Sequence, residues 1–550
     1  MIKTIKLNFG ASPSSPPLEL NPGAMTVFIG PNNSGKSLLL REIASLIKNP
    51  PQVRGHQKIL ADVSIEGPES RGNLRQALIG FGATEEEGNL LMPTQGYSTW
   101  VHILGVQFKI PVNPSQDELL NLLGQTAMIV LDGETRLRLV SATQSGDLVG
   151  RPTSLLHALF IDDAARKRLR KLTSEAFGLY AVIDPTSLSK FRVRMSPRPP
   201  DDDEEEQSLS VRARTFHAQA TDIQDLSDGV KAYTGILSAL LSGKSRIIII
   251  DEPEAFLHPA LARRLAFEIS VVAKERNANV IAATHSADFL MGCIEAGAGT
   301  QIVRLTYSNS LATARHMPAD DLSTLMRIPL LRTTNVLGAL FHVGAVVTES
   351  EADRAFYDEV NHRLIGAKDE GARGVSFLFA QNKQTVHTIL RPLRRLGIPA
   401  AAIVDMDVVK EGGKVFSNIL EAAGVPSLMR QSLGDVRGKL KDALDAANPN
   451  WKIQGGIGTL GKDDAAACRD FIEKLAEYGV FVVPGGELES WLPHLKVNKS
   501  KHLWLGEVFG QMGSDPASAD YMKPSLGDVW EFMRRIARWI GNPNRKGLPL

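Results

Sequence analysis

The chain has 550 residues, of which 43% are hydrophobic and 22% are charged, and its formal net charge is +1. This length exceeds what one hydrophobic core supports and predicts at least two domains. No apolar run approaches the roughly eighteen residues that span a bilayer, and two cysteines are too few for a disulfide framework or a cysteine-rich metal cluster. The first residues read as a strand rather than a signal peptide, so we expect a cytoplasmic protein with no membrane partner.

The stretch MTVFIGPNNSGKSLLLREI, residues 25–43, joins a short apolar run, a glycine-rich turn and an amphipathic pattern. It matches G-x-x-x-x-G-K-[ST] in full, between a predicted strand and a predicted helix, as a P-loop requires. The backbone N–H groups of such a loop and the helix N-terminus hold phosphates. We predict that Lys36 reaches the outer phosphates of ATP and that Ser37 faces Mg²⁺. The predicted nucleotide-binding residues here are Gly30, Asn32, Asn33, Ser34, Gly35, Lys36 and Ser37.

The following segments predict additions to a nucleotide-binding core. Residues 58–145 contain the β-like runs KILADVSIEG, TWVHILGVQFKI and RLRLVSA, which favour an antiparallel β lobe. Residues of about 155–180 have helical spacing and a basic face, and indicate a small helical insertion. Prolines and an acidic run at about 196–207 favour a solvated, mobile loop. A helical connector ends near residue 340, where we expect the boundary between the two domains, 1–340 and 341–550.

The stretch RIIIIDEPEAFLHP, residues 246–259, predicts a strand buried on both faces that presents two carboxylates at its C-terminal end. One carboxylate of such a pair holds magnesium and the other polarises the attacking water. We therefore assign Asp251 to the metal and Glu252 to the role of general base.

Three further stretches occur in a fixed order with these motifs: LSDGVKAY at 226–233, EAFLHP at 254–259 and VIAATHS at 280–286. Together with the P-loop and the acidic strand end they resemble the ABC-type ATPase heads of the RecF and SMC class over about residues 1–340. The resemblance implies that Ser227 and Gly229 contact the γ-phosphate of ATP bound to a second subunit, and that His285 senses that phosphate. ATP is then enclosed between two heads of a homodimer or higher homo-oligomer.

The resemblance is incomplete at two points. Asp228 stands where many members of the class have glycine, and a carboxylate there is expected to slow or regulate hydrolysis. The resemblance also does not fix which glutamine covers the nucleotide. We assign this role to Gln107, with Gln95 as the alternative.

The C-terminal half carries acidic residues after three predicted strands. VGAVVTESEADRAFY at 343–357, IPAAAIVDMD at 398–407 and VFVVPGGELESWL at 480–492 each combine an apolar run with carboxylates. In a parallel α/β unit the carboxyl ends of the strands meet at one edge of the sheet. Clustered oxygen ligands without cysteine suit Mg²⁺ or Mn²⁺. The predicted ligands are Glu349, Asp353, Asp405, Asp407, Glu487 and Glu489.

These strand ends resemble the Toprim fold, and ALFHVGAVVTESEADRAFY joined to an ABC-type head resembles the OLD nuclease family, which includes the Gabija nuclease subunit. The resemblance covers nearly the whole chain. It implies an α/β protein with an ABC-type P-loop head followed by a Toprim domain and a C-terminal helical extension. The implied activity is ATP-regulated, metal-dependent DNA cleavage in bacterial anti-phage defence, with a further defence protein as a partner. Two ions about 3.5 to 4 Å apart would activate water and stabilise the leaving 3′ oxygen.

Within this resemblance, Glu349 and Asp405 take bridging or first-site roles. Asp353, Asp407 and Glu489 act as metal ligands or hold water, and Glu487 has a weaker supporting role. The family also places a lysine after the last acidic cluster.

That lysine is assigned to Lys523, with Lys496, Lys499 and Lys501 as alternatives. The family usually has glycine after the first glutamate, whereas here Ser350 follows it and Glu351 adds a carboxylate.

Basic clusters that could anchor DNA phosphates lie in RPLRRLG, with Arg391, Arg394 and Arg395, and in the terminal RRIARWIGNPNRKG. The alternative function is an ATP-driven DNA-binding or signalling switch with a weak or inactive Toprim domain, which Ser350 and Asp228 favour. A Toprim primase or topoisomerase is a third hypothesis, although no segment resembles a strand-passage domain with a nucleophilic tyrosine.

Overall fold

The computed structural model divides into two compact units, Met1–Ser323 and Thr324–Leu550. The division falls within 319–335, outside the described residues and earlier in the chain than the boundary expected near residue 340. The structure describes residues 1–65, 84–86, 89–94, 97–98, 101–102, 106–109, 117, 120–121, 124, 127–150, 152–243, 246–297, 299–308, 310–318, 336–498 and 500–547.

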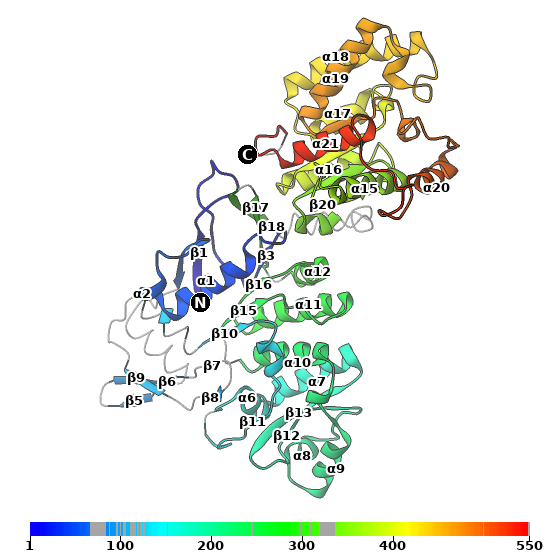
Figure 1. Ribbon diagram of the computed structural model, residues 1–550. Helices are drawn as coiled ribbons and strands as arrows, with labels where there is room; N and C mark the ends of the chain where they lie inside the picture. Colours follow the sequence, from blue (N-terminus) through cyan, green and yellow to red (C-terminus); the bar gives the residue numbers. More distant parts are fainter. Residues whose placement is uncertain are drawn as a thin grey trace. The chain divides into compact units, whose positions relative to one another are not determined.

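The first unit is built on a six-stranded sheet in the order β10-β15-β16-β3-β17-β18 (Figure 1). Strands from β10 to β17 run parallel, and β18 folds back antiparallel on β17. Four isoleucines of β15 have no exposed surface, because a strand with parallel neighbours on both sides is covered on both faces. The strands are β3 (Met25–Ile29), β10 (Met128–Leu131), β15 (Ile247–Asp251), β16 (Asn279–Ala283), β17 (Gln301–Ser308) and β18 (Leu311–Pro318).

The helices of this sheet follow its strands. The predicted P-loop helix is α1 (Lys36–Lys48), which is followed by the short α2 (Pro50–Val53). Helix α10 (Asp228–Leu241) precedes β15, and α11 (Pro259–Glu275) and α12 (Ala287–Glu295) lie side by side (Figure 1). The ends of β3, β15 and β16 are thus each followed by a loop and a helix, which is the arrangement that places ligands at the carboxyl edge of a sheet.

Antiparallel strands form smaller sheets. Strands β1 (Ile2–Leu7), β2 (Glu19–Leu20) and β4 (Leu60–Ile65) form one sheet, and β5 (Thr84–Glu86), β6 (Asn89–Thr94) and β9 (Val106–Lys109) form another. However, the first β-like run of the expected lobe, which contains β4, pairs with the N-terminal strand β1. Strands β7 (Tyr97–Ser98) and β8 (Val101–His102) pair with each other.

The expected strand in RLRLVSA is wrong, because Thr135–Arg138 form helix α5. The Asp132 carboxylate accepts from the backbone N–H of Glu134 and of Thr135, at 3.1 and 2.8 Å, and this turn starts the helix.

The insertion expected at about 155–180 consists of helices α6 (Leu155–Ile161) and α7 (Asp163–Phe177). They accompany a sheet made of β11 (Thr143–Gln144), β13 (Lys190–Ser196), β12 (Tyr180–Asp184) and β14 (Thr221–Asp222). Helix α9 (Val211–Gln219) and the 3₁₀ helix η1 (Ile223–Asp225) lead to α10.

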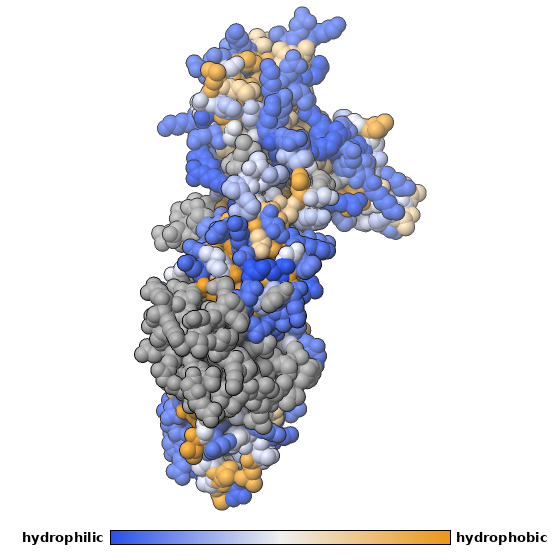
Figure 2. Space-filling model, turned by 90° about the vertical axis from the view of Figure 1, so that its left-hand side faces the viewer, coloured by the Kyte–Doolittle hydropathy of each residue, from blue (hydrophilic) through white to orange (hydrophobic). Residues whose placement is uncertain are grey.

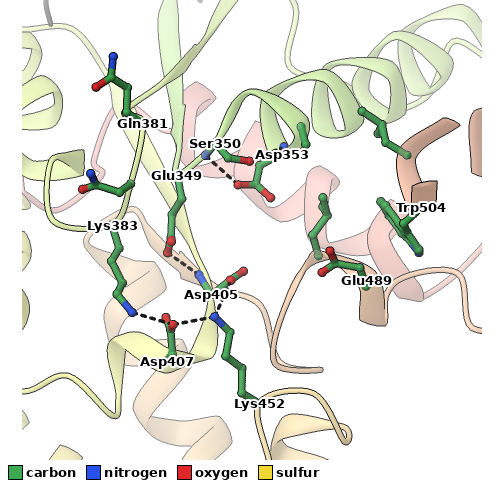
Figure 3. Close-up of a pocket in the computed structure, with 14 residues that line it drawn as sticks. Glu349, Ser350, Asp353, Gln381, Lys383, Asp405, Asp407, Lys452, Glu489 and Trp504 are labelled. Carbon is green, nitrogen blue, oxygen red and sulfur yellow. Dashed lines mark hydrogen bonds and ion pairs between the residues drawn. The ribbon is translucent and has the colours of Figure 1, made fainter. Parts of the chain in front are cut away.

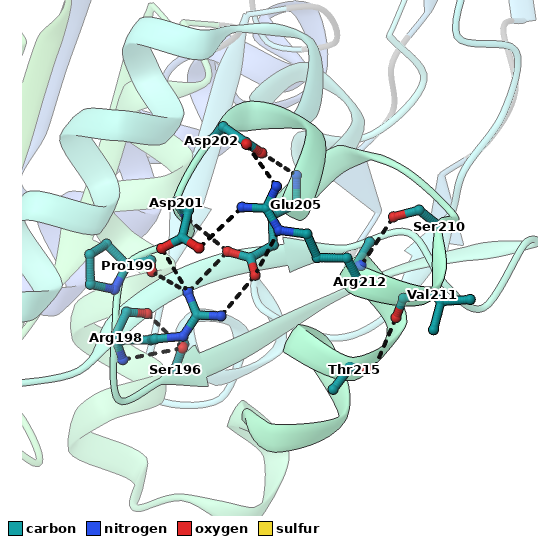
Figure 4. Close-up of polar contacts among 11 residues, drawn as sticks. Ser196, Arg198, Pro199, Asp201, Asp202, Glu205, Ser210, Val211, Arg212 and Thr215 are labelled. Atoms are coloured by element: carbon teal, nitrogen blue, oxygen red, sulfur yellow. Dashed lines mark hydrogen bonds and ion pairs between the residues drawn. The ribbon is translucent and has the colours of Figure 1, made fainter.

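The acidic run forms helix α8 (Asp203–Gln207) rather than a solvated loop (Figure 4). The buried Glu205 carboxylate accepts from the Arg198 guanidinium at 2.8 Å and from the Asp201 N–H at 2.8 Å, and Arg212 lies 3.5 Å away. The hydrogen bond from Arg198 holds the pKa of Glu205 at about 2. Arginines that flank the acidic run in sequence thus neutralise it locally.

The second unit is built on a parallel sheet in the order β20-β19-β21-β22. Its strands are β19 (Gly344–Thr348), β20 (Val375–Phe379), β21 (Ala400–Val404) and β22 (Val480–Val482). The helices are α15 (Glu351–Gly366), α16 (Val386–Arg395), α17 (Gly413–Ala422), α18 (Ser427–Ala447), α19 (Lys462–Glu477), α20 (Lys501–Met512) and α21 (Asp528–Gly541). Short 3₁₀ helices are η2 (Val336–Phe341), η3 (Met406–Val408), η4 (Gly456–Thr459) and η5 (Leu488–Ser490).

On the face that Figure 2 shows, the described surface of each unit is largely hydrophilic, with hydrophobic side chains in small groups. Single exposed apolar residues of this kind are ordinary in folded proteins. In the part of the chain that the structure describes, no helix is both long and apolar enough to cross a membrane.

Candidate functional site

The P-loop joins β3 to α1 through backbone that favours glycine. Gly30 has φ +142°, and a Cβ there would lie 2.0 Å from the carbonyl oxygen of Leu305. Gly35, the N-cap of α1, has φ +92°, and its Cβ would meet Ile59 at 2.4 Å. Asn33, at φ +62°, is a residue type that tolerates this region. The two glycines of the motif are therefore required by close packing as well as by backbone conformation.

Lys36 is only 4% exposed and is held by the loop itself. Its ammonium donates to the carbonyl oxygens of Gly30 and Pro31, each at 2.9 Å, and to the Ser34 hydroxyl at 3.3 Å. Burial lowers the pKa of Lys36 to about 8, against the opposing charge of Asp251. These neutral partners are weaker than a phosphate, so the loop presents the ammonium to an anionic ligand.

Ser37 and Asp251 meet although they are far apart in the sequence. The Ser37 hydroxyl donates to an oxygen of Asp251 at 3.1 Å. A hydroxyl and a carboxylate are oxygen donors that suit Mg²⁺, so these two residues fit the ion that accompanies ATP.

Glu252 and His285 lie beside this pair. Glu252 follows β15, and its carboxylate is 3.6 Å from His285 Nε2. Burial, and then the charge of Lys36, lowers the pKa of His285, which favours the neutral imidazole. The structure therefore brings together the predicted P-loop lysine, metal ligand, base and histidine.

Glu254 is a residue of this site that the sequence analysis did not single out. Its carboxylate accepts from the Thr284 hydroxyl at 2.7 Å and from the His285 N–H at 2.9 Å. Burial raises the pKa of Glu254. In the sequence EPEAFLHP it lies three residues after Asp251, and only the folded structure shows that it reaches Thr284 and His285.

The predicted signature residues begin helix α10. Ser227 is its N-cap, and a Cβ on Gly229 would lie 2.6 Å from the carbonyl oxygen of Phe256. The start of α10 therefore packs against the loop that follows β15. The Asp228 carboxylate is half exposed and lies 3.3 Å from the Lys231 ammonium, which offsets the charge that distinguishes this signature.

The two glutamine candidates have no described side chain. Gln107 lies in β9, which pairs with β6 outside the six-stranded sheet, and its side chain is outside the described residues, as is Gln95. In the six-stranded sheet β15 lies between β10 and β16, and β10 leads into helix α5, which carries the buried Arg136.

In the second unit, Glu349 and Asp405 directly follow the neighbouring parallel strands β19 and β21. Glu349 accepts from the Asp405 N–H at 2.9 Å. Oxygen atoms of Glu349, Asp405 and Asp407 all lie within 4.8 Å of one another, as Figure 3 illustrates. Three hard oxygen ligands at this spacing fit one divalent cation such as Mg²⁺ or Mn²⁺.

The carboxylates of this cluster are strongly perturbed. Burial, and then repulsion from Asp405, raises the pKa of Glu349 to about 8. Burial raises the pKa of Asp405 to about 7, although Lys452 opposes the rise. The ionised forms of Glu349 and Asp405 are thus disfavoured until a cation compensates them.

Two lysines that the sequence analysis missed also line this pocket. Lys383 and Lys452 donate to the same oxygen of Asp407, at 2.8 and 2.7 Å, and Lys452 lies 3.3 Å from Asp405 (Figure 3). Although burial opposes it, these hydrogen bonds hold the pKa of Asp407 below its usual value. Lys383 lies in the loop directly after β20, at the edge of the sheet where the carboxylates were expected, so its position was a signal that the sequence reasoning overlooked. Lys452 lies far from any strand end in sequence, and no local pattern marked it.

The remaining predicted carboxylates differ in position. Asp353 and Glu489 line the pocket, which has a volume of about 350 Å³, whereas Glu487 is buried and does not line it. Ser350 is the N-cap of α15, and an Asp353 oxygen accepts from the Ser350 N–H at 2.8 Å. This capping box satisfies the backbone of the turn at Ser350, where the OLD resemblance led us to expect glycine. Glu351 points to solvent, with 73% of its side chain exposed, and does not line the pocket.

The predicted lysine, Lys523, is exposed and does not line the pocket. Lys496 is also exposed and does not line it, Lys499 is outside the described residues, and the side chain of Lys501 is not described.

The basic clusters proposed for DNA are partly structural. Arg394 is 2% exposed and donates to the carbonyl oxygens of Ala400, Ala423 and Tyr478. Arg391 lies 3.0 Å from Glu421, while Arg395 is exposed. The arginines of α21 form ion pairs with carboxylates, namely Arg534 with Asp369, Arg535 with Glu473 and Arg538 with Glu370.

Comparison with known proteins identifies part of the first unit. Residues 146–292 match the sequence profile of a family described as "AAA domain, putative AbiEii toxin, Type IV TA system". This part of the first unit is therefore similar to an ATPase domain, and the P-loop sequence itself lies before it, at residues 30–37. The match includes β15, β16 and α10 but neither the P-loop itself nor the second unit.

Solved structures similar to the chain include SMC heads and an ABC transporter component. The SMC head domain from Thermotoga maritima is 15% identical, with a TM-score of 0.28, over 58% of this chain and 98% of that chain. A Pyrococcus furiosus SMC head with an extended coiled coil, bound to the C-terminal domain of ScpA, is 14% identical, with a TM-score of 0.34, over 59% and 98%. The cbiO1 protein from Clostridium perfringens, part of the cbiONQ transporter complex, is 12% identical, with a TM-score of 0.28, over 60% and 97%. No curated protein sequence matches the chain.

Proposed function

We propose that the chain hydrolyses ATP in its first unit and cleaves DNA in its second unit as a metal-dependent endonuclease, with an ABC-type head followed by a Toprim domain. The observation that carries the nuclease proposal is the cluster of Glu349, Asp405 and Asp407 at the carboxyl ends of parallel strands, within 4.8 Å of one another. Ionised carboxylates this close together, two of them half-buried and one buried, repel one another, and a cation relieves the repulsion. This arrangement supports the proposal that follows from the OLD and Toprim resemblance.

In the first unit, the chain's residues divide the work of ATP hydrolysis. Lys36 neutralises the outer phosphates, and Ser37 and Asp251 hold Mg²⁺. Glu252 accepts the proton of the attacking water, and His285, oriented by Glu254, contacts the γ-phosphate. Ser227 and Gly229 contact the nucleotide of a second subunit, so the active assembly is a homodimer or a higher homo-oligomer.

In the second unit, Glu349 and Asp405 are the principal metal ligands, and Asp407, Asp353 and Glu489 complete the surroundings. Bound Mg²⁺ or Mn²⁺ supplies Lewis acidity and a water of lowered pKa for phosphodiester hydrolysis. Lys452 and Lys383 balance the charge of Asp407. Lys452 also lies close enough to Asp405 to contact a DNA phosphate next to a cation that these carboxylates would hold. Lys452 therefore replaces Lys523 as the proposed lysine of the site.

The substrate of the second unit is DNA, and ATP binding or turnover licenses or restrains its cleavage. The resemblance also supports a role in bacterial anti-phage defence in the cytoplasm, together with a partner protein of the defence system.

One observation favours the alternative of an ATP-driven DNA-binding or signalling switch with a weak second unit. Asp407 is already paired with two ammonium groups, which compete with a cation for its oxygens. A measurement of metal binding by the second unit therefore distinguishes the nuclease from the ATP-driven switch.

The test incubates purified protein with supercoiled DNA and Mg²⁺ or Mn²⁺, with and without ATP. Nicked or linear products that require the metal support the nuclease. Intact DNA under every metal and nucleotide condition, with Mn²⁺ binding also absent in calorimetry, favours the switch.

A further inference from the structure

Arg136 is a buried arginine with an unusual set of partners. Its side chain is 1% exposed, and within the described part of the chain no carboxylate forms an ion pair with it. Its guanidinium instead donates to three backbone carbonyl oxygens: Asp132 at 2.8 Å, Asp251 at 2.7 Å, and Glu252. Burial of the guanidinium is offset by these carbonyl oxygens and by the nearby charges of Glu254 and Glu252, so the position of Arg136 is tied to the end of β15.

Two of these carbonyls belong to the turn that presents the proposed general base. Glu252 has φ +50°, in the left-handed region, which is a strained conformation for a residue other than glycine. Its N–H donates to the carbonyl oxygen of Ala283 at 2.8 Å, and its C=O accepts from Arg136. The strained peptide is therefore fixed on both sides, by β16 and by Arg136.

The position of Arg136 is itself fixed by the fold. Strand β10 runs parallel to β15, with Leu131 beside Ile250, so α5 starts near the end of β15. Helix α5 also packs closely on α10, because a Cβ on Gly235 would lie 2.7 Å from the carbonyl oxygen of Arg136. Arg136 is thus anchored by β10, α5 and α10, which all lie outside the turn that its guanidinium holds.

We infer that Arg136 is a positioning residue for ATP hydrolysis, which clamps the backbone of Asp251 and Glu252 so that the Glu252 carboxylate faces the attacking water. This inference rests on the proposed ATPase function. Arginine suits the task because its planar fork reaches two adjacent carbonyls at once, which a lysine ammonium does not do in the same geometry. The P-loop contacts of Lys36 do not involve Arg136, so nucleotide binding is separable from it.

The experiment compares Arg136→Gln and Arg136→Lys with the wild-type protein. The matched control is Arg138→Gln, on the same helix, where the arginine is partly exposed and pairs with Glu134. Both Arg136 variants are expected to lower kcat by about 10- to 100-fold, the size of effect that misplacing a catalytic group produces. The Kd for ATP is expected to stay within about threefold, because the P-loop is intact.

A second readout follows the turn directly and does not need ATP hydrolysis. Amide hydrogen exchange in the peptide covering residues 251–257 is expected to accelerate in the Arg136 variants and to stay unchanged in Arg138→Gln. Millimolar guanidinium is expected to restore part of kcat in Arg136→Ala by refilling the vacated site. If Arg136→Gln does not fold, Arg136→Lys, which keeps the charge, decides both readouts.

The outcomes separate this inference from the proposed function. If the wild-type protein hydrolyses no ATP, the ATPase proposal fails, and the exchange of residues 251–257 alone decides whether Arg136 holds the turn. Unchanged exchange in a folded Arg136 variant overturns the inference. A folded variant with kcat within twofold of wild type also overturns it, as does a parallel loss of ATP binding and melting temperature without a selective loss of kcat.

Discussion

Replacing Asp405 by Asn is expected to stabilise the metal-free second unit at neutral to alkaline pH. Burial raises the pKa of Asp405 from 3.8 to about 7. A carboxyl with a higher pKa in the folded chain binds protons more tightly there, so folding stability falls as the pH rises from about 4 to about 7 and stays reduced above it. The full difference corresponds to about 4 kcal/mol. Glu349 and Asp405 titrate together, and Lys452 keeps its ion pair with Asp407 in the variant. We therefore expect the free energy of unfolding to rise by only about 1–2 kcal/mol at pH 8.

The assay is calorimetric unfolding in a chelating buffer at pH 5.5 and pH 8. For a unit of this size the gain shifts the melting temperature by about 2–4 °C per kcal/mol. The shift should be largest at pH 8 and should shrink at pH 5.5, where the wild-type carboxyl is protonated. Glu351→Gln, at an exposed carboxyl beside Ser350, is the control and should leave the transition unchanged. An Asp405→Asn protein that melts at or below the wild-type temperature at pH 8 would refute the account of this cluster.

Further predictions concern the two sites separately. Lys36→Ala should abolish ATP binding, and Glu252→Gln should bind ATP without turning it over, which equilibrium binding and phosphate release measure; normal turnover by Glu252→Gln contradicts its assignment as the base. Ser227→Arg should suppress hydrolysis alone but recover part of it when mixed with Lys36→Ala, because one composite site of the mixed dimer is then intact; no recovery, with mixed dimers verified, argues against nucleotide shared between heads. Lys452→Ala should reduce DNA cleavage at least tenfold more than Lys523→Ala, since Lys452 contacts Asp405 and Asp407 and Lys523 does not line the pocket; equal effects contradict the choice of lysine.

Local patterns were sufficient where a backbone motif determines a site. The P-loop, the isoleucine strand and the acidic strand ends each combine a strand with residues fixed immediately after it, and the structure places them as predicted on β3, β15, β19 and β21. Parallel pairing then brings Glu349 and Asp405 together without further information.

Residues that reach a site from distant segments could not be identified in this way. Lys452 approaches Asp407 from a loop 45 residues away from it, and Arg136 reaches the end of β15 across more than a hundred residues. The acidic run was misread because flanking arginines, not water, compensate Glu205. RLRLVSA was misread because the Asp132 turn outweighs its β-like alternation.

The most direct test of the central claim is metal-dependent cleavage of supercoiled DNA by Asp405→Ala, measured beside ATP hydrolysis by the same preparation. The account predicts that cleavage is lost while ATP hydrolysis stays close to wild type, because the carboxylate cluster and the P-loop belong to separate units. Glu351→Ala, which removes a neighbouring exposed carboxylate, should cleave normally. An Asp405→Ala protein that cuts DNA within a few fold of wild type would contradict the nuclease assignment.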